Sequence, residues 1–133
     1  MRSYDTPAFF YWCPSGDGRK TKQTDYLAVI GPETAWPGRT GRSLKEITDD
    51  PAGTILILEV AHSGIHWMEP RDPTLDDVLS SGLGSNHAGH VNALFANGQV
   101  RKVRTGIARS TLRALLTVNG GETVDPGEWI FRE

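Results

Sequence analysis

The stretch that decides the fold runs from Ser85 to Val103 and reads SNHAGHVNALFANGQVRKV. In its first half Val91, Ala93 and Phe95 share one face of an extended chain, an alternation that predicts a strand with one buried side. Asn97-Gly98 separates this run from a second, more polar extended run. An Asn-Gly pair in this position is a strong hairpin signal, because both residues tolerate positive φ and can form a type I′ turn. The sequence therefore predicts an antiparallel hairpin.

Two further strands are predicted before the hairpin. Thr54–Val60, TILILEV, is rich in aliphatic residues and too short for a core helix, so it reads as a central strand. Glu59 lies within it, and a carboxylate in a buried strand needs a partner. We expect Glu59 to face solvent instead, on a sheet that is covered on one side only. Thr24–Ile30 is the other predicted strand, with Tyr26 on one of its faces.

Ile107–Val118 carries the best helical pattern of the chain. Leu112, Leu115 and Leu116 form an apolar stripe at helical spacing, with Ser110 as the expected N-cap. The helix is expected to end at residues 119–121, Asn-Gly-Gly, because glycine accepts the left-handed conformation of a C-cap.

A shorter helix is predicted from Asp72-Pro73 to about Ser80, with Asp72 as its cap. Together these elements predict an α+β fold, with a mainly antiparallel sheet, the hairpin at its centre and the C-terminal helix packed on one face. A length of 133 residues predicts a single domain. We expect positions 1–18 to form an aromatic-rich extended arm, and positions 123–133 to form a tail with a final edge strand.

Charge and hydropathy limit the classes of partner. The chain has 14 Lys and Arg against 16 Asp and Glu, a net charge of −2, so it lacks the basic excess of a nucleic-acid-binding protein. Its longest mostly apolar run covers positions 54–61, far short of the roughly 20 residues that span a bilayer. We therefore expect no nucleic-acid partner, and neither a signal peptide nor membrane insertion by this chain.

Five motifs in order resemble the bacterial prepilin-type H-x9-DG domain family, a group of pseudopilin-like proteins. The resemblance extends from Cys13 to Glu122. In the family's last motif, a histidine is followed after nine residues by Asp-Gly, whereas in this chain His87 is followed by Asn97-Gly98. The matching motifs are Cys13-Pro14-Ser15, the Gly31–Ala35 loop, Ser63-Gly64 with Trp67 and Glu69–Asp72, the His87 motif, and Leu112–Thr117 followed by Gly120-Gly121-Glu122.

The resemblance implies a pilin-head-like fold and a non-enzymatic structural or assembly role, as in type II secretion or type IV pilus-like systems. It implies self-association or other pilin-like subunits as partners, and a place in the cell envelope or outside the cell. Family members begin with a prepilin leader and a long hydrophobic helix. This sequence shows neither, so we expect it to correspond to the globular part alone, as a fragment or as a short natural version.

Aromatic residues at the two ends are the candidate contact surfaces, because exposed aromatic clusters mark interfaces. Completion of the core is the equally weighted alternative for them. The candidates are Phe9, Phe10 and Trp12 in the arm, and Trp129 and Phe131 in the tail.

A zinc-dependent hydrolase is the enzymatic alternative. His62 and His66 are spaced H-x3-H and His87 and His90 are spaced H-x2-H, and imidazoles with a carboxylate can hold zinc and activate water. The first spacing brings both rings together only in a helix, which Gly64 disfavours. We therefore expect no catalytic residue and no metal, with local hydrogen bonding as the role of His87 and His90.

Three other chemistries are weaker. Cys13 stands alone in the sequence and is expected to be a small buried hydrophobe instead of a nucleophile. A calcium ion, the other alternative cofactor, would use the aspartates at 72, 76 and 77 or at 49 and 50. A carbohydrate- or surface-binding module would use Trp36 and Trp67 as stacking platforms.

Overall fold

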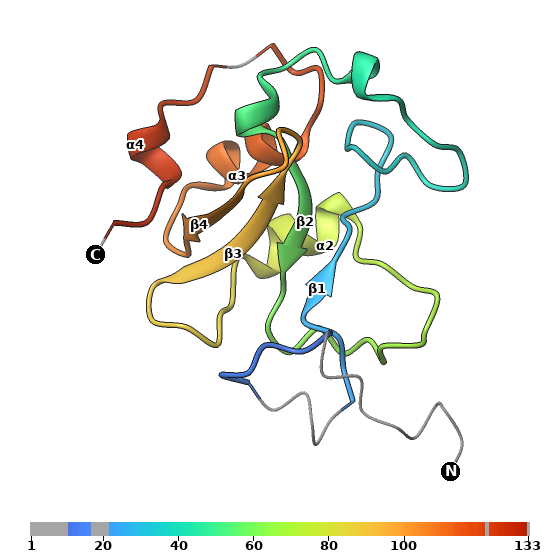
Figure 1. The fold of residues 1–133 in the computed structure, drawn as a ribbon, viewed down its shortest axis with the longest axis vertical. Coiled ribbons are helices and arrows are strands. Elements are labelled where there is room, and N and C mark those ends of the chain that lie inside the picture. Colours follow the sequence, from blue (N-terminus) through green and yellow to red (C-terminus); the bar gives the residue numbers. More distant parts are fainter. Residues whose placement is uncertain (1–10, 17–21, 122, 133) are drawn as a thin grey trace.

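The computed structural model describes residues 11–16, 22–121 and 123–132 (Figure 1). None of the helices in this described part reaches the length and apolar character that a membrane span requires. In chain order, the elements are β1 (Tyr26–Leu27), the 3₁₀ turns η2 (Leu44–Glu46) and η3 (Pro51–Gly53), β2 (Ile55–Glu59), α2 (Leu75–Ser81), β3 (His90–Phe95), β4 (Val100–Arg104), α3 (Arg109–Leu116) and α4 (Pro126–Trp129).

The four strands form one sheet in the order β1-β2-β3-β4, with every neighbouring pair antiparallel. The helices α2 and α3 lie behind this sheet in Figure 1, which confirms the α+β prediction. The predicted hairpin is β3–β4 and supplies one inner strand and one edge strand. The strand predicted at 24–30 is paired in the sheet only at 26–27, because Ile30 instead bonds the residues that lead into α2.

The tip of the hairpin differs from the predicted type I′ turn. In the described part of the chain Gly98 has a φ of 85°, but Asn97 is not among the residues with positive φ. Phe95 accepts a hydrogen bond from the Gly98 amide and donates one to the Gln99 carbonyl, each at 2.9 Å. This is the pattern of a three-residue loop with a left-handed glycine and a bulge. The Asn97 Oδ1 atom accepts a bond from the Gln99 amide at 3.1 Å, a role that a carboxylate oxygen can also fill.

The core lies between the sheet and the helices. Val91, Ala93 and Phe95 are all buried, as the alternation in β3 predicted. They pack in one cluster with the leucine stripe of α3, so the periodicity of both elements identified the inward faces correctly. Each large side chain buried in this way contributes about 1.5–3 kcal/mol to the stability of the fold.

The ends of α3 differ from those predicted. Ala108, not Ser110, is the N-cap, and the helix ends at Leu116 with Thr117 in an extended conformation. The amide of Val118 then donates to the Glu33 carbonyl at 3.0 Å. A tertiary hydrogen bond thus draws the chain out of the helix before it reaches the glycine pair.

The start of α2 also differs from the prediction. Thr74, not Asp72, is the N-cap, and it exchanges side-chain-to-backbone bonds with Asp77 in a capping box. The reciprocal pair satisfies two amides that the first turn of a helix leaves without partners. This requirement places the first residue of the helix at Leu75.

The C-terminal tail is not the predicted strand. It forms the short helix α4, after which Ile130 makes a single antiparallel bridge to Val103 and the Phe131 amide donates to the Lys102 carbonyl at 3.0 Å. The tail thereby covers part of the free edge of β4, which would otherwise offer unpaired backbone groups to another chain.

Trp129 is 3% exposed and its ring lies 4.9 Å from that of Phe95. Of the two roles considered for Trp129, a contact surface and completion of the core, its burial fits the second.

Substitution Trp129→Ala should lower the free energy of unfolding by about 3–5 kcal/mol, as expected when a large aromatic side chain is removed from a packed core. Urea denaturation followed by circular dichroism measures this change. Val100→Ala is the control: this side chain is 67% exposed, and its loss should cost less than about 0.5 kcal/mol. Equal, small losses in both variants would contradict the assignment of Trp129 to the core.

Candidate functional site

A row of polar side chains crosses the face of the sheet that points away from α2 and α3. Tyr26 of β1 is paired with Glu59 of β2. Leu58 is paired with Ala93, so Glu59 falls beside Asn92 of β3. Leu58 and Ala93 belong to the core, and neighbouring residues of a strand point to opposite faces. Glu59 therefore projects from the second face, as predicted.

Glu59 is nevertheless fully buried, with 0% of its surface exposed, so the prediction that it faces solvent is wrong. The segment 11–16 lies over this part of the sheet. It is fixed by two hydrogen bonds with Asp25: the Cys13 amide donates to the carboxylate at 2.6 Å, and the Asp25 amide donates to the Tyr11 carbonyl at 2.7 Å. Cys13 is also 0% exposed, as predicted for a buried thiol.

The loop that precedes β3 supplies the third member of the site, His87. The Ser85 hydroxyl accepts a hydrogen bond from the His87 amide at 2.9 Å and donates to the His90 carbonyl. The His87 ring stacks on the His90 ring, with 4.9 Å between centroids. His90 in turn contacts the Phe131 ring at 4.8 Å. These contacts orient His87 toward the sheet.

Cys13, Glu59 and His87 meet at one point, which we call the Cys-Glu-His cluster. The Nε2 atom of His87 lies 3.1 Å from the Cys13 Sγ atom and 3.3 Å from Glu59 Oε1. One donor atom from each residue lies within 4.8 Å of the other two, and no other triple of His, Cys, Asp or Glu in the described residues does so. Asn92 Nδ2 donates to the second Glu59 oxygen at 3.5 Å.

The cluster does not have the geometry of a nucleophilic triad. In such a triad the acid binds one ring nitrogen of the histidine and the nucleophile binds the other. Here the thiol and the carboxylate approach the same nitrogen, Nε2 of His87. The Cys13 thiol is also fully buried, so a substrate cannot reach it without displacement of the segment 11–16.

Burial dominates the electrostatics of this region. It raises the pKa of Glu59, with the Asp25 charge acting in the same direction, while His87 and the Asn92 hydrogen bond oppose the rise. Burial also raises the pKa of Tyr26 to about 12, assisted by electrostatic interactions with Cys13, Glu59 and Asp25 and by a hydrogen bond with Cys13. Every group that affects Tyr26 acts in one direction, because each disfavours a phenolate beside an already acidic cluster.

The structure does not bring the four histidines together. The Cys-Glu-His cluster contains His87 but not His62, His66 or His90. His66 Nδ1 instead accepts a hydrogen bond from the Met68 amide at 3.1 Å, and its ring stacks beside Trp67. The arrangement that the hydrolase alternative requires is absent from the described part of the chain.

Trp36 and Trp67 lie far apart. Trp36 is bridged to Ile30, whereas His66, next to Trp67, is bridged to Gln23. An extended chain advances about 3.3 Å per residue, so the two rings lie at opposite ends of the segment 23–30 and do not share a platform.

Three of the five aspartates named for calcium bind backbone amides. Asp49 accepts bonds from the Gly120 and Gly121 amides at 3.0 and 2.9 Å, and Asp50 accepts one from the Ala52 amide. Asp77 belongs to the capping box of α2. Backbone capping explains these three carboxylates without a bound ion.

The aromatic arm is only partly described. Phe9 and Phe10 lie outside the described residues, and Trp12 is half-buried. Phe131 is also half-buried, against His90.

Sequence reasoning missed the contact of Glu59 with Cys13 and His87. Each of the three residues nevertheless carried a signal in the sequence: Glu59 is a carboxylate in an aliphatic strand, and Cys13 and His87 are motif positions.

No family model, no curated protein and no solved structure matches this chain.

In a buffer that contains a metal chelator, Tyr26 should ionise with a pKa of about 12, well above the ordinary tyrosine pKa of 10. The folded state keeps this proton between pH 10 and 12 while the unfolded state loses it, so the free energy of unfolding should fall by roughly 2 kcal/mol over that range. Ultraviolet titration of phenolate measures the pKa. Tyr26→Phe should remove both the late transition and this part of the pH dependence, and a tyrosine transition unchanged by that substitution would contradict the assignment.

In the same buffer, Cys13 should react with an aromatic disulfide reagent on the order of 100-fold more slowly in the native protein than in urea, because reaction requires local opening. Release of the coloured thiol measures both rates. A native rate close to that of the unfolded chain would mean that the thiol is accessible, as a catalytic cysteine must be.

Proposed function

We propose that this protein is a non-enzymatic structural domain that works through contacts with other proteins, in the manner of a pseudopilin head. The observation that carries the proposal is the position of the motif residues. Cys13 and His87, from two motifs 74 residues apart, meet over Glu59 in a buried cluster. Residues placed in this way hold segments of the chain together and offer no surface to a substrate.

The H-x9 spacing supports the same role. His87 stands three residues before β3, and Asn97-Gly98 follows two residues after its end. The motif therefore spans one strand. Its histidine covers Glu59 at one end of the strand, and its glycine forms the hairpin tip at the other. Both functions are architectural.

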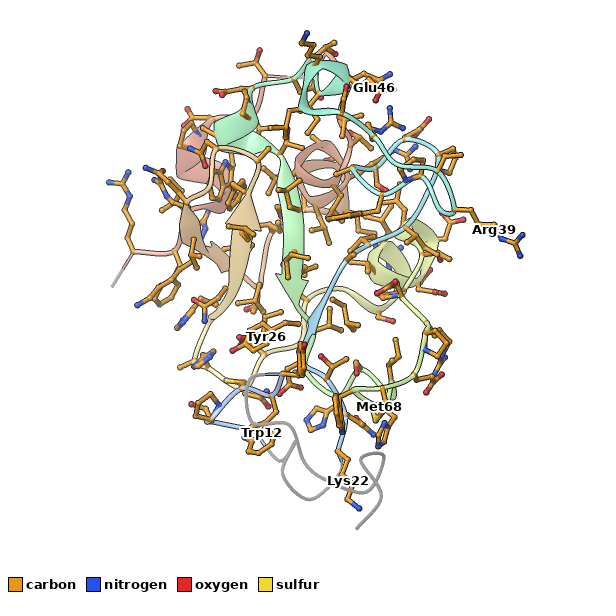
Figure 2. The ribbon with its side chains drawn as sticks, turned by 45° about the vertical axis from the view of Figure 1, so that its right-hand side comes forward. Trp12, Lys22, Tyr26, Arg39, Glu46 and Met68 are labelled. Atoms are coloured by element: carbon orange, nitrogen blue, oxygen red, sulfur yellow. The ribbon has the colours of Figure 1, made fainter. Side chains whose placement is uncertain are left out.

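A revised contact surface replaces the aromatic tail. Tyr11 is 48% exposed and Met68 is 45% exposed. The Tyr11 ring stacks on Trp67 at 5.9 Å, and Trp67 stacks on His66. We call Tyr11, His66, Trp67 and Met68 the aromatic end. Trp12 and Met68 lie at the same end of the molecule in Figure 2, opposite Glu46.

Such a patch suits contact with another copy or with a pilin-like subunit at the cell envelope or outside the cell. Aromatic residues and methionine are enriched at protein interfaces. Backbone hydrogen bonds hold this patch in place. The Trp67 amide donates to the Lys22 carbonyl at 3.0 Å, and the Thr24 amide donates to the Ile65 carbonyl at 2.9 Å. A rigid, exposed aromatic surface loses little freedom on binding.

Replacement of Tyr11 and Met68 by serine should weaken self-association about 10-fold or more, because loss of an interface anchor costs at least about 1.4 kcal/mol. Sedimentation equilibrium over a range of protein concentrations measures the dissociation constant. Circular dichroism checks that the fold is retained.

Leu44→Ser is the matched control. Leu44 is apolar and 69% exposed, and it lies in η2, beside Glu46 at the opposite end of the molecule. Its replacement should leave association unchanged. A wild-type chain that stays monomeric at all concentrations, or equal weakening by Leu44→Ser, would count against the aromatic end as the self-association surface.

A further inference from the structure

The Cys-Glu-His cluster presents sulfur, nitrogen and oxygen donors to one point, and from this we infer that Cys13, Glu59 and His87 bind a single zinc ion. The bound ion fixes the segment 11–16 and the loop before β3 to the second face of the sheet. This inference goes beyond the proposed assembly role and does not depend on it.

The spacing of the donors fits a tetrahedral ion. Zinc lies about 2.3 Å from a thiolate sulfur and about 2.0–2.1 Å from nitrogen or oxygen ligands. Tetrahedral angles then separate sulfur from nitrogen by about 3.6 Å and nitrogen from oxygen by about 3.3 Å. The observed separations from His87 Nε2 are 3.1 Å to Cys13 Sγ and 3.3 Å to Glu59 Oε1. Small side-chain movements suffice to admit the ion.

A second observation points to a ligand. Glu59 is 0% exposed, and its Oε1 atom accepts no hydrogen bond from the described part of the chain. A buried carboxylate is costly unless a cation neutralises it. His87 can do so only in its protonated form, whereas a metal ion does so with the imidazole neutral. This oxygen is the atom that lies beside His87 Nε2, so it is directed to the point where the ion would bind.

The surrounding residues support the three donors. Asn92 bonds the other oxygen of Glu59, and Asp25 bonds the backbone amide of Cys13. The His90 ring stacks on His87 and fixes its plane. Groups that orient the ligands in this way are a general feature of protein metal sites.

The donor set selects the type of metal. Thiolate and imidazole favour zinc and similar ions over calcium and magnesium, which prefer oxygen ligands alone. Three protein ligands leave a fourth position for solvent, near the 22% of the His87 side chain that is exposed. An open fourth position is typical of catalytic zinc. Cys13 and Glu59 are fully buried, however, so in this proposal the ion serves to hold the segment 11–16 and the loop before β3 in place.

Cobalt(II) added to the chelator-treated full chain is the first test. Cobalt in a tetrahedral site with a thiolate ligand gives intense visible bands and a sulfur-to-metal charge-transfer band in the near ultraviolet. The chain contains one cysteine, so such a band reports on Cys13 alone. We expect one cobalt per chain, its displacement by zinc, and a higher melting temperature with either metal.

Cys13→Ser and Glu59→Gln should each weaken zinc binding by more than about 100-fold, since removal of a direct ligand costs more than loss of a supporting group. Competition with a chromophoric chelator measures the affinity. His62→Gln is the matched control, a histidine outside the cluster, and should bind zinc as the unaltered chain does. If a ligand variant does not fold, the cobalt spectrum of the unaltered chain still decides the question.

Cobalt binding without the charge-transfer band would overturn the inference, as would zinc affinity that survives both ligand substitutions. The variant with serine at positions 11 and 68 should still bind one zinc per chain. A failure of the metal site and a failure of the assembly role therefore give different results.

Discussion

A carboxylate buried in a β-sheet must be neutralised, hydrogen-bonded or paired, and the rest of this structure depends on how Glu59 meets that requirement. The side chain rises from the face of the sheet that the helices leave open. Two segments distant in sequence close over it, one carrying Cys13 and the other carrying His87. Neither segment has regular secondary structure, so each is held by specific polar contacts: Asp25 fixes the first, and Ser85 fixes the second. The buried carboxylate thus determines where both segments lie.

The two faces of the sheet are stabilised by different kinds of interaction. On the helix side, β2, β3 and α3 contribute aliphatic and aromatic side chains to one cluster, and Trp129 completes it. That side is stabilised by burial of apolar surface, which is non-directional and therefore tolerates small shifts in side-chain position. On the other side, directional contacts among a thiol, an imidazole, an amide and a carboxylate tolerate far less, because a lost partner leaves a buried polar atom without compensation.

These differences bear on function. A buried polar cluster that joins two distant segments of the chain is compatible with the proposed structural role, because Cys13 and Glu59 are not accessible to a substrate. The exposed aromatic residues lie at the end of the molecule near the segment 11–16, so fixation of this segment also fixes part of the proposed contact surface. The cluster and the aromatic end are therefore two parts of one architecture, in which a rigid interior supports an exposed patch.

The sequence by itself determined the hairpin, the alternation of β3 and the apolar stripe of α3, because alternation and helical spacing follow from local backbone geometry. It also placed Glu59 on the open face. It did not determine the ends of the helices, the conformation of the tail or the burial of Glu59. The end of α3 depends on a bond from Val118 to Glu33, and the tail depends on the free edge of β4. The meeting of Cys13, Glu59 and His87 was decided by tertiary structure alone, because it joins segments 46 and 28 residues apart in the chain (59 − 13 and 87 − 59), and no local pattern encodes contacts over such separations.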